Sequence, residues 1–291
     1  MKRADVSSVQ IGGGRSLQVR RWDGTGRPLV LLHGLLDDSE GWAQLAADTH
    51  RPCIAIDLPG FGASDLPRLP RIGSYAGDVV RGLDAMGIQD CTLVGHSLGG
   101  AVAAAVCSRT DAVASLTLLA PAGFGRIRLS EAMTLPGVRD VAERALPLAL
   151  LNPLVCTAAY STFVSHRQLP SRDLVERLRR RAWHSGPGVS AAVEAIAHAG
   201  RDPRGFTRRT IDFDGAVAAL WGRHDALVST SHIPALRAAL PQAHVEVWRG
   251  MGHHPQRERP AQLARFIEQR ASRARRATRR RRRRSELRPA A

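Results

Sequence analysis

The chain has 291 residues, 44% hydrophobic but only 4% aromatic, so one large α/β domain is expected with Ala, Leu and Val filling its core. The formal net charge is +16, but residues 270–291 hold eleven Arg and one Glu, which leaves +6 for the other 269 residues. No signal peptide, transmembrane segment or C-x-x-C motif is recognisable in the sequence, so we expect a cytoplasmic protein with buried free thiols at most of its four cysteines.

The order of the predicted elements indicates an α/β fold. Alternating apolar and polar residues around a triple glycine predict a β-hairpin over 6–21. Apolar runs predict strands at 28–32, 53–56, 91–94, 114–119 and 216–221, and a further strand is predicted at 243–248. Helical patterns fall at 40–47, 75–86, 101–107, 231–240 and from Pro260 onwards. Strands that alternate with helices predict a mostly parallel central sheet with helices on both faces.

The alternation stops after residue 122 and returns at about residue 206. The residues between these points show helical periods and no convincing strand. We therefore predict four parts: 1–122 and 206–269 form the α/β core, 123–205 form an inserted helical cap, and 270–291 form an Arg-rich tail, disordered or partly helical.

The tail carries six consecutive arginines, from Arg279 to Arg284. These charges repel one another and favour an extended, solvated chain, which can attract polyanions without specificity. The tail has no interleaved aromatic residue, so no specific nucleic-acid partner is expected. An extension without a dedicated partner is the alternative.

One stretch predicts a nucleophile. Gly95-His96-Ser97-Leu98-Gly99 follows an apolar strand and precedes an Ala-rich helix. A strand-to-helix turn this tight leaves no room for bulky neighbours, hence Gly95 and Gly99, and it pushes the Ser97 hydroxyl clear of the sheet edge. The N–H of Leu98 then points to where a negative oxygen would form. A chance glycine-rich turn with a surface serine is the alternative.

The partners of Ser97 are sought at the edge where the carboxyl ends of parallel strands meet. Polar residues that follow predicted strands are His33, Asp57, Asp225 and His253. Asp212 and Asp214 precede a strand and should lie at the opposite edge. The remaining residues include a serine, an acid and a histidine in the order Ser, Asp, His.

Several of these residues have other interpretations. His254 is adjacent to His253, so only one of the two is expected to act as a base. Asp225 could cap a turn. His33 is interpreted as a structural residue that holds its loop, and Asp57 as a turn-stabilising carboxylate.

Five ordered motifs resemble the α/β-hydrolase family over about residues 10–270. They lie at residues 31–34, 57–64, 95–100, 220–225 and 252–260. The resemblance implies a nucleophile, a base, an orienting acid and an oxyanion hole made of two backbone N–H groups. By this resemblance Ser97 would be the nucleophile, His253 the base and Asp225 the acid that orients the base. The N–H groups of Leu35 and Leu98 would form the oxyanion hole. His33, Gly34, Gly95 and Gly99 would support these roles.

The favoured function is a serine esterase or lipase-like hydrolase acting on an ester, thioester or similar acyl substrate with an apolar part. Histidine can take the serine proton and return it to the leaving group, and a carboxylate on its other nitrogen fixes the tautomer. This chemistry needs neither a metal nor an organic cofactor. A carbon–carbon bond hydrolase or cofactor-free perhydrolase on the same residues is the first alternative, and a non-catalytic binding protein on this scaffold is the second.

Overall fold

The computed structural model describes residues 2–132, 152–165, 169–184, 186–201 and 211–270, together with 135, 137, 138, 141 and 145. Its centre is an eight-stranded sheet in the order β1-β2-β4-β3-β5-β6-β7-β8. The strands are β1 (Asp5–Gln10), β2 (Ser16–Trp22), β3 (Leu29–Leu32), β4 (Cys53–Ile56), β5 (Cys91–His96), β6 (Val113–Leu119), β7 (Ala216–Gly222) and β8 (His244–Trp248). Strands β3 to β8 run parallel, and the β1–β2 hairpin joins β4 in the antiparallel sense. The predicted fold class is confirmed.

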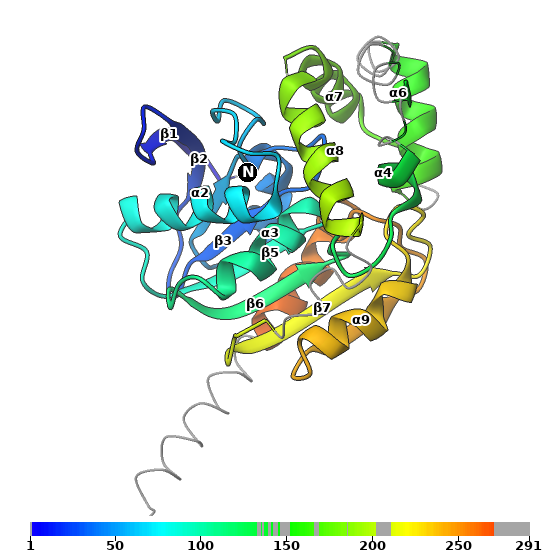
Figure 1. The fold of residues 1–291 in the computed structure, drawn as a ribbon. Helices are drawn as coiled ribbons and strands as arrows, with labels where there is room; N and C mark the ends of the chain where they lie inside the picture. The colour runs from blue at the N-terminus through cyan, green and yellow to red at the C-terminus, as the bar shows by residue number, and fades with distance from the viewer. Residues whose placement is uncertain are drawn as a thin grey trace, which may run out of the picture.

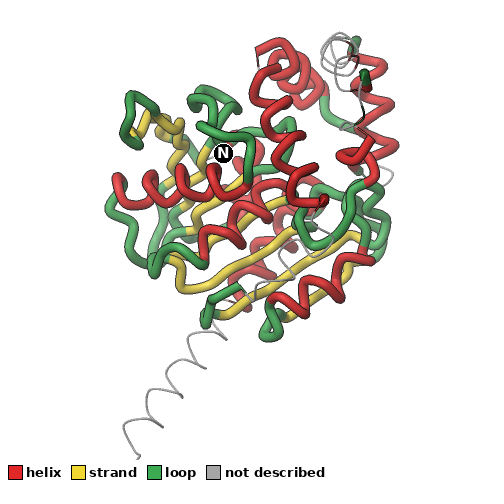
Figure 2. Tube along the Cα trace, in the orientation of Figure 1, coloured by secondary structure: helices red, strands yellow, loops and turns green. Residues whose placement is uncertain are grey.

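The central strands β3, β5 and β6 are mostly apolar and almost entirely buried because helices cover both faces of the sheet (Figures 1 and 2). Helices α2 (Ile72–Ala85), α3 (Leu98–Cys107) and α9 (Ile233–Ala239) contribute to the core on one face. Helix α1 (Ala43–Asp48) and the helical residues 260–270 contribute to the core on the other. Neighbouring residues of β5 point to opposite faces of the sheet, so Leu93 lies in the first core and Val94 in the second.

Several helix boundaries differ from the predictions, and helix α3 begins at Leu98, three residues before its predicted start. Helix α2 begins at Ile72, three residues before the predicted start. The helix expected from residue 231 begins as a 3₁₀ turn, η4 (Thr230–His232), and the one expected from residue 40 begins as the 3₁₀ helix η1 (Ser39–Trp42). A short helix, α10 (Pro255–Glu258), precedes the predicted last helix. Capping residues and short turns leave a weaker signal in the sequence than apolar periodicity does, so helix ends are less predictable than helix centres.

Between β6 and β7 the described chain is helical. Its elements are α4 (Arg128–Ala132), α6 (Pro153–Ala159), the π-helix η2 (Tyr160–Val164), α7 (Arg172–His184) and α8 (Gly186–Arg201) (Figure 1). We call these five elements together the helical insertion. Helix α8 approaches the loop after β4 closely, because a Cβ on Gly188 would lie 1.7 Å from the carbonyl oxygen of Gly60. The insertion therefore touches the edge of the sheet at which the parallel strands end.

Some sequence predictions lie outside the described residues. They include parts of the predicted cap, residues 123–205, and the arginine-rich segment 271–291 with its proposed polyanion contacts. Within the described part of the chain, no helix combines the length and the apolar character needed to cross a membrane.

All four cysteines are free and buried, as expected. Burial raises the pKa values of the Cys53 and Cys91 thiols to about 12. Reaction with a disulfide reagent requires the thiolate. We therefore expect Cys53, Cys91 and Cys107 to stay unmodified in native protein at pH 8 and to react within minutes after unfolding in guanidinium. Mass mapping of the labelled cysteines checks this, and rapid labelling of Cys53 in native protein would contradict the packing described.

Candidate active site

The chain turns sharply at Ser97, between β5 and α3. Ser97 has φ 51° and ψ −114°, a conformation that costs a non-glycine residue about 1–3 kcal/mol. Surrounding hydrogen bonds hold it there: the Ser97 N–H donates to the carbonyl of Leu119 (2.9 Å), and the Ser97 carbonyl accepts from the N–H groups of Gly100 (2.9 Å) and Ala122 (3.0 Å). The side chain lies at the end of the central strand, and the residue is 9% exposed.

Gly95 and Gly99 allow this turn because, without side chains, they let the start of α3 lie directly against the ends of β3 and β5. A Cβ on Gly99 would lie 2.3 Å from the carbonyl oxygen of Leu32 and 2.4 Å from that of His33. A Cβ on Gly95 would lie 2.3 Å from the carbonyl oxygen of Gly99. Helix α3 therefore begins directly against the end of β3, where the predicted oxyanion loop starts.

That loop is held by His33 and passes close to Ser97. The Nε2 of His33 accepts from the N–H of Leu58 (2.9 Å), so its Nδ1 carries the proton that is donated to the carbonyl of Gly34 (2.8 Å). A Cβ on Gly34 would lie 3.2 Å from the Cβ of Ser97. His33 thus has the structural contacts that the sequence suggested, and a Cβ at position 34 would also crowd Nδ1 of His96 at 2.8 Å.

Asp225 and His253 come together from the loops after β7 and β8. The Nδ1 of His253 lies 2.7 Å from Oδ2 of Asp225, and these side chains are 4% and 0% exposed. The other carboxylate oxygen of Asp225 accepts from the N–H groups of Leu227 (2.9 Å) and Val228 (2.8 Å). Asp225 therefore stabilises a turn and contacts His253 at once, which combines the two sequence interpretations.

Asp57 has the contacts of a turn residue. Its Oδ1 accepts from the N–H of Ser39 (2.6 Å), and its Oδ2 accepts from the N–H of Ala63 (3.3 Å). Its backbone carbonyl accepts from the hydroxyl of Ser64 (2.6 Å). These bonds hold the loop after β4, as the sequence analysis expected.

Three residues that sequence reasoning left without a supporting role fix the His253 loop. The carboxylate of Glu258 accepts from the N–H groups of Gly252 (2.9 Å) and His254 (3.1 Å). The Nε2 of His96 donates to the carbonyl of His253 (2.8 Å), while its Nδ1 accepts from the amide of Gln256 (3.1 Å). An acidic residue in the first turn after Pro255 was the one signal available for Glu258, since acidic side chains near helix starts bind backbone N–H groups.

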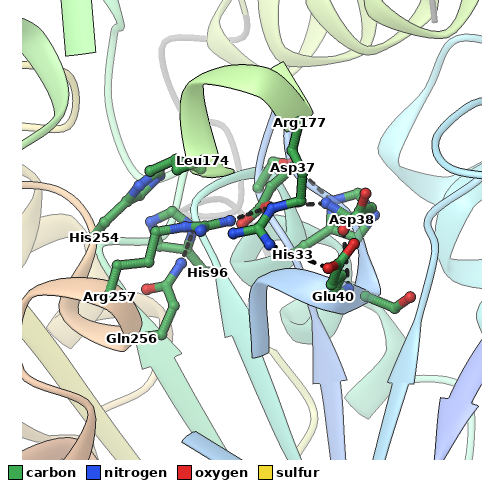
Figure 3. Close-up of polar contacts among 12 residues, drawn as sticks. His33, Asp37, Asp38, Glu40, His96, Leu174, Arg177, His254, Gln256 and Arg257 are labelled. Carbon is green, nitrogen blue, oxygen red and sulfur yellow. Dashed lines mark hydrogen bonds and ion pairs between the residues drawn. The ribbon is translucent and has the colours of Figure 1, made fainter. Parts of the chain in front are cut away.

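A largely buried ion pair joins the loop after β3 to the short helix α10, which directly follows His253 and His254. The guanidinium of Arg257 donates to the carboxylate of Asp37 over 2.6 Å, and these side chains are 14% and 3% exposed (Figure 3). Gly41 makes room for the pair, because a Cβ there would lie 2.5 Å from Asp37 and 2.8 Å from Arg257. Removing one member of such a pair leaves an uncompensated buried charge, so the pair constrains both segments.

The helical insertion contacts the same region. The N–H of His253 donates to the carbonyl of Val164 in η2 over 2.7 Å. Arg177 of α7 donates to Glu40 of η1 over 3.1 Å, near Asp37 (Figure 3). Leu36, in the loop after β3, packs together with Leu178 of the insertion against Cys156 and Val175. The insertion thus lies against the loops that carry the candidate residues.

Two histidines around His253 are kept neutral. Burial, and next the neighbouring His253, lowers the pKa of His96 well below its usual value. Burial, and next His96, does the same to the pKa of His254. Among the described residues, no group of three or more His, Cys, Asp and Glu is arranged to hold a metal ion. The two imidazole rings packed beside His253 therefore carry no charge around pH 7.

The comparisons with known proteins establish the class of this protein. Residues 27–260, which are most of the chain, match the family described as "alpha/beta hydrolase fold". The chain therefore belongs to the α/β-hydrolase fold family.

Its relatives include enzymes of several activities. It is 33% identical over 261 residues to the dihydrolipoyllysine-residue acetyltransferase component of the acetoin cleaving system of Pseudomonas putida, covering 86% of this chain and 65% of that protein. It is 25% identical to the 2-hydroxy-6-oxo-6-phenylhexa-2,4-dienoate hydrolase of Comamonas testosteroni, covering 85% and 90%. A crystal structure of a membrane phospholipase A superimposes with a TM-score of 0.70 at 26% identity, covering 94% and 87%. The family and the two hydrolytic relatives support a hydrolase.

The elbow geometry predicts opposite outcomes for two glycine substitutions. Gly99→Ala would place a Cβ against two backbone carbonyls, so we expect destabilisation of roughly 1–3 kcal/mol and loss of activity. The Cβ added by Gly77→Ala in α2 would meet only arginine side-chain atoms, at 3.7 Å or more. The free energy of unfolding should therefore stay the same or rise. Urea unfolding of both variants measures the difference, and equal stabilities would contradict the close approach of α3 and β3.

Proposed function

We propose that the protein is a serine hydrolase in which Ser97 is the nucleophile, His253 the base and Asp225 the residue that orients the base. The observation that carries this proposal is the buried 2.7 Å contact between Asp225 and Nδ1 of His253, at the sheet edge where the backbone of Ser97 is strained. A carboxylate on Nδ1 leaves Nε2 unprotonated and ready to accept a proton.

The proposed reaction is acyl transfer in two steps. The Ser97 hydroxyl attacks the acyl carbon while His253 takes its proton, and the N–H groups of Leu35 and Leu98 stabilise the negative oxygen. His253 then gives that proton to the leaving alcohol or thiol. In the second step His253 takes a proton from water, which attacks the acyl-enzyme, and returns it to Ser97 as the acid leaves. No step requires a metal or an organic cofactor.

The insertion supports a preference for a small-molecule acyl substrate with an apolar part. Leu36, next to the proposed oxyanion donor Leu35, packs with Val175 and Leu178 of the insertion. Tyr160 is 7% exposed against the same region, whereas Val155 is 44% exposed. We therefore propose that residues 123–205 act as a lid whose inner face is apolar near the oxyanion loop.

A carbon–carbon bond hydrolase is the second candidate, because the relative from Comamonas testosteroni is a hydrolase of a 2-hydroxy-6-oxo-dienoate and matches most of this chain. The same three residues would serve that chemistry. Activity on a vinylogous 2-hydroxy-6-oxo acid but not on esters would favour it. A non-catalytic binding protein would react with neither.

A fluorophosphonate probe is the direct test of the nucleophile. We expect it to label Ser97 in wild-type protein, because attack on the probe needs the same proton removal as attack on an ester. Ser97→Ala should abolish both labelling and turnover of the best p-nitrophenyl ester in an acyl-chain series, with the circular dichroism spectrum unchanged. Turnover within a factor of two of wild type would refute the mechanism.

The roles of His253 and Asp225 predict an ordering within two pairs of variants. His253→Ala should lower kcat/KM by roughly 10³–10⁴-fold, since it removes the base, and His254→Ala should cost far less. Asp225→Asn should also be severe, because the amide favours the wrong histidine tautomer. Asp214→Asn, exposed just before β7, is the matched control and should be near neutral. The reverse order between the histidines would move the base to His254.

A further inference from the structure

The His253 loop is held by the π-helix η2 at two consecutive residues. The N–H of His253 donates to the carbonyl of Val164 (2.7 Å), and the hydroxyl of Tyr160 lies 3.2 Å from Nδ1 of His254. Both partners come from one turn, which is closed by the hydrogen bond from the N–H of Ser165 to the carbonyl of Tyr160 (3.0 Å). π turns are rare in proteins and concentrate at functional sites.

His254 connects Tyr160 to His253 through ring contacts. Its ring centroid lies 5.7 Å from that of Tyr160 and 5.6 Å from that of His253, with the two imidazoles inclined by only 30°. The ring centroid of His96 lies 4.7 Å from that of His254. Tyr160 and His254 are 7% and 9% exposed, so their hydrogen bond is shielded from water. The Tyr160 hydroxyl is therefore in place to fix the orientation of the His254 ring.

The charge states of the two partners fit this contact. Burial lowers the pKa of His254 and raises that of Tyr160, so both are neutral around pH 7. A neutral His254 adds no positive charge beside His253 when that ring takes a proton. The contact is thus available throughout the proposed catalytic cycle.

We propose that Tyr160, from the helical insertion, is a positioning residue for proton transfer: its hydroxyl fixes the His254 ring, which forms one wall around the His253 ring. The inference rests on the proposed function and deepens it. The insertion then orients the base as well as covering the site. Small displacements of a catalytic group lower reaction rates steeply, so the hydroxyl should affect kcat more than substrate binding.

The test compares two hydroxyl deletions in the same π turn. Tyr160→Phe removes the contact to His254, and Thr162→Val removes an exposed hydroxyl two residues along. Steady-state kcat and KM on the best ester, the rate of fluorophosphonate labelling of Ser97, and the melting temperature are measured for both. We expect Tyr160→Phe to lower kcat and the labelling rate about 3–10-fold, the range of one buried hydrogen bond, with KM within twofold. Thr162→Val should match wild type.

A double-substitution cycle shows whether the hydroxyl acts through His254. His254→Phe keeps an aromatic ring but removes Nδ1, so Tyr160→Phe should cause no further loss of kcat in that background. An equal loss there, a change confined to KM, or an unchanged kcat and labelling rate would each overturn the inference while leaving the proposed function standing. Wild-type protein that is never labelled at Ser97 and turns over no ester would overturn both.

Discussion

The backbone at Ser97 holds a conformation that L-residues rarely adopt, and much of the surrounding structure exists to keep it there. Leu119 and Ala122 from the neighbouring strand end bind its backbone, and Gly99 lets α3 press against β3. Among the described residues, the non-glycine residues with positive φ are Leu36, Ser97 and Ala120, all at this edge. Strain of this kind persists only where packing over-determines it, and it marks functional sites.

The helical insertion contributes to the same edge in a different way. It contacts the oxyanion loop through an apolar cluster around Leu36 and the His253 loop through Val164 and Tyr160. An insertion attached this way cannot move without disturbing either the proposed oxyanion donors or the proposed base. Any opening of the site would therefore couple substrate entry to the geometry of catalysis.

Much of this architecture was predictable because it depends on local patterns. Apolar runs marked the buried strands, and G-x-S-x-G between a strand and a helix placed Ser97. The contacts of His96, Glu258 and the Arg257–Asp37 pair were not predictable, because they join residues that only the folded chain brings together. His96 and His253 are 157 residues apart, and Arg257 and Asp37 are 220 apart. The Val164 contact uses a backbone carbonyl, which any residue could supply, so no side-chain pattern marks it.

The sheet order also affects how the protein is made. The elbow on β5 can form against β3 and β6, but β8 joins the sheet at its edge and follows β7 in the chain. At about 5–20 residues per second of synthesis, the 157 residues between His96 and His253 take roughly 8–30 s to emerge. Throughout that interval the nascent chain carries Ser97 without the residue proposed as its base. The proposed site is therefore assembled only after β8 and the loop that carries His253 have been made, so a truncated product that ends before β8 would lack the proposed base.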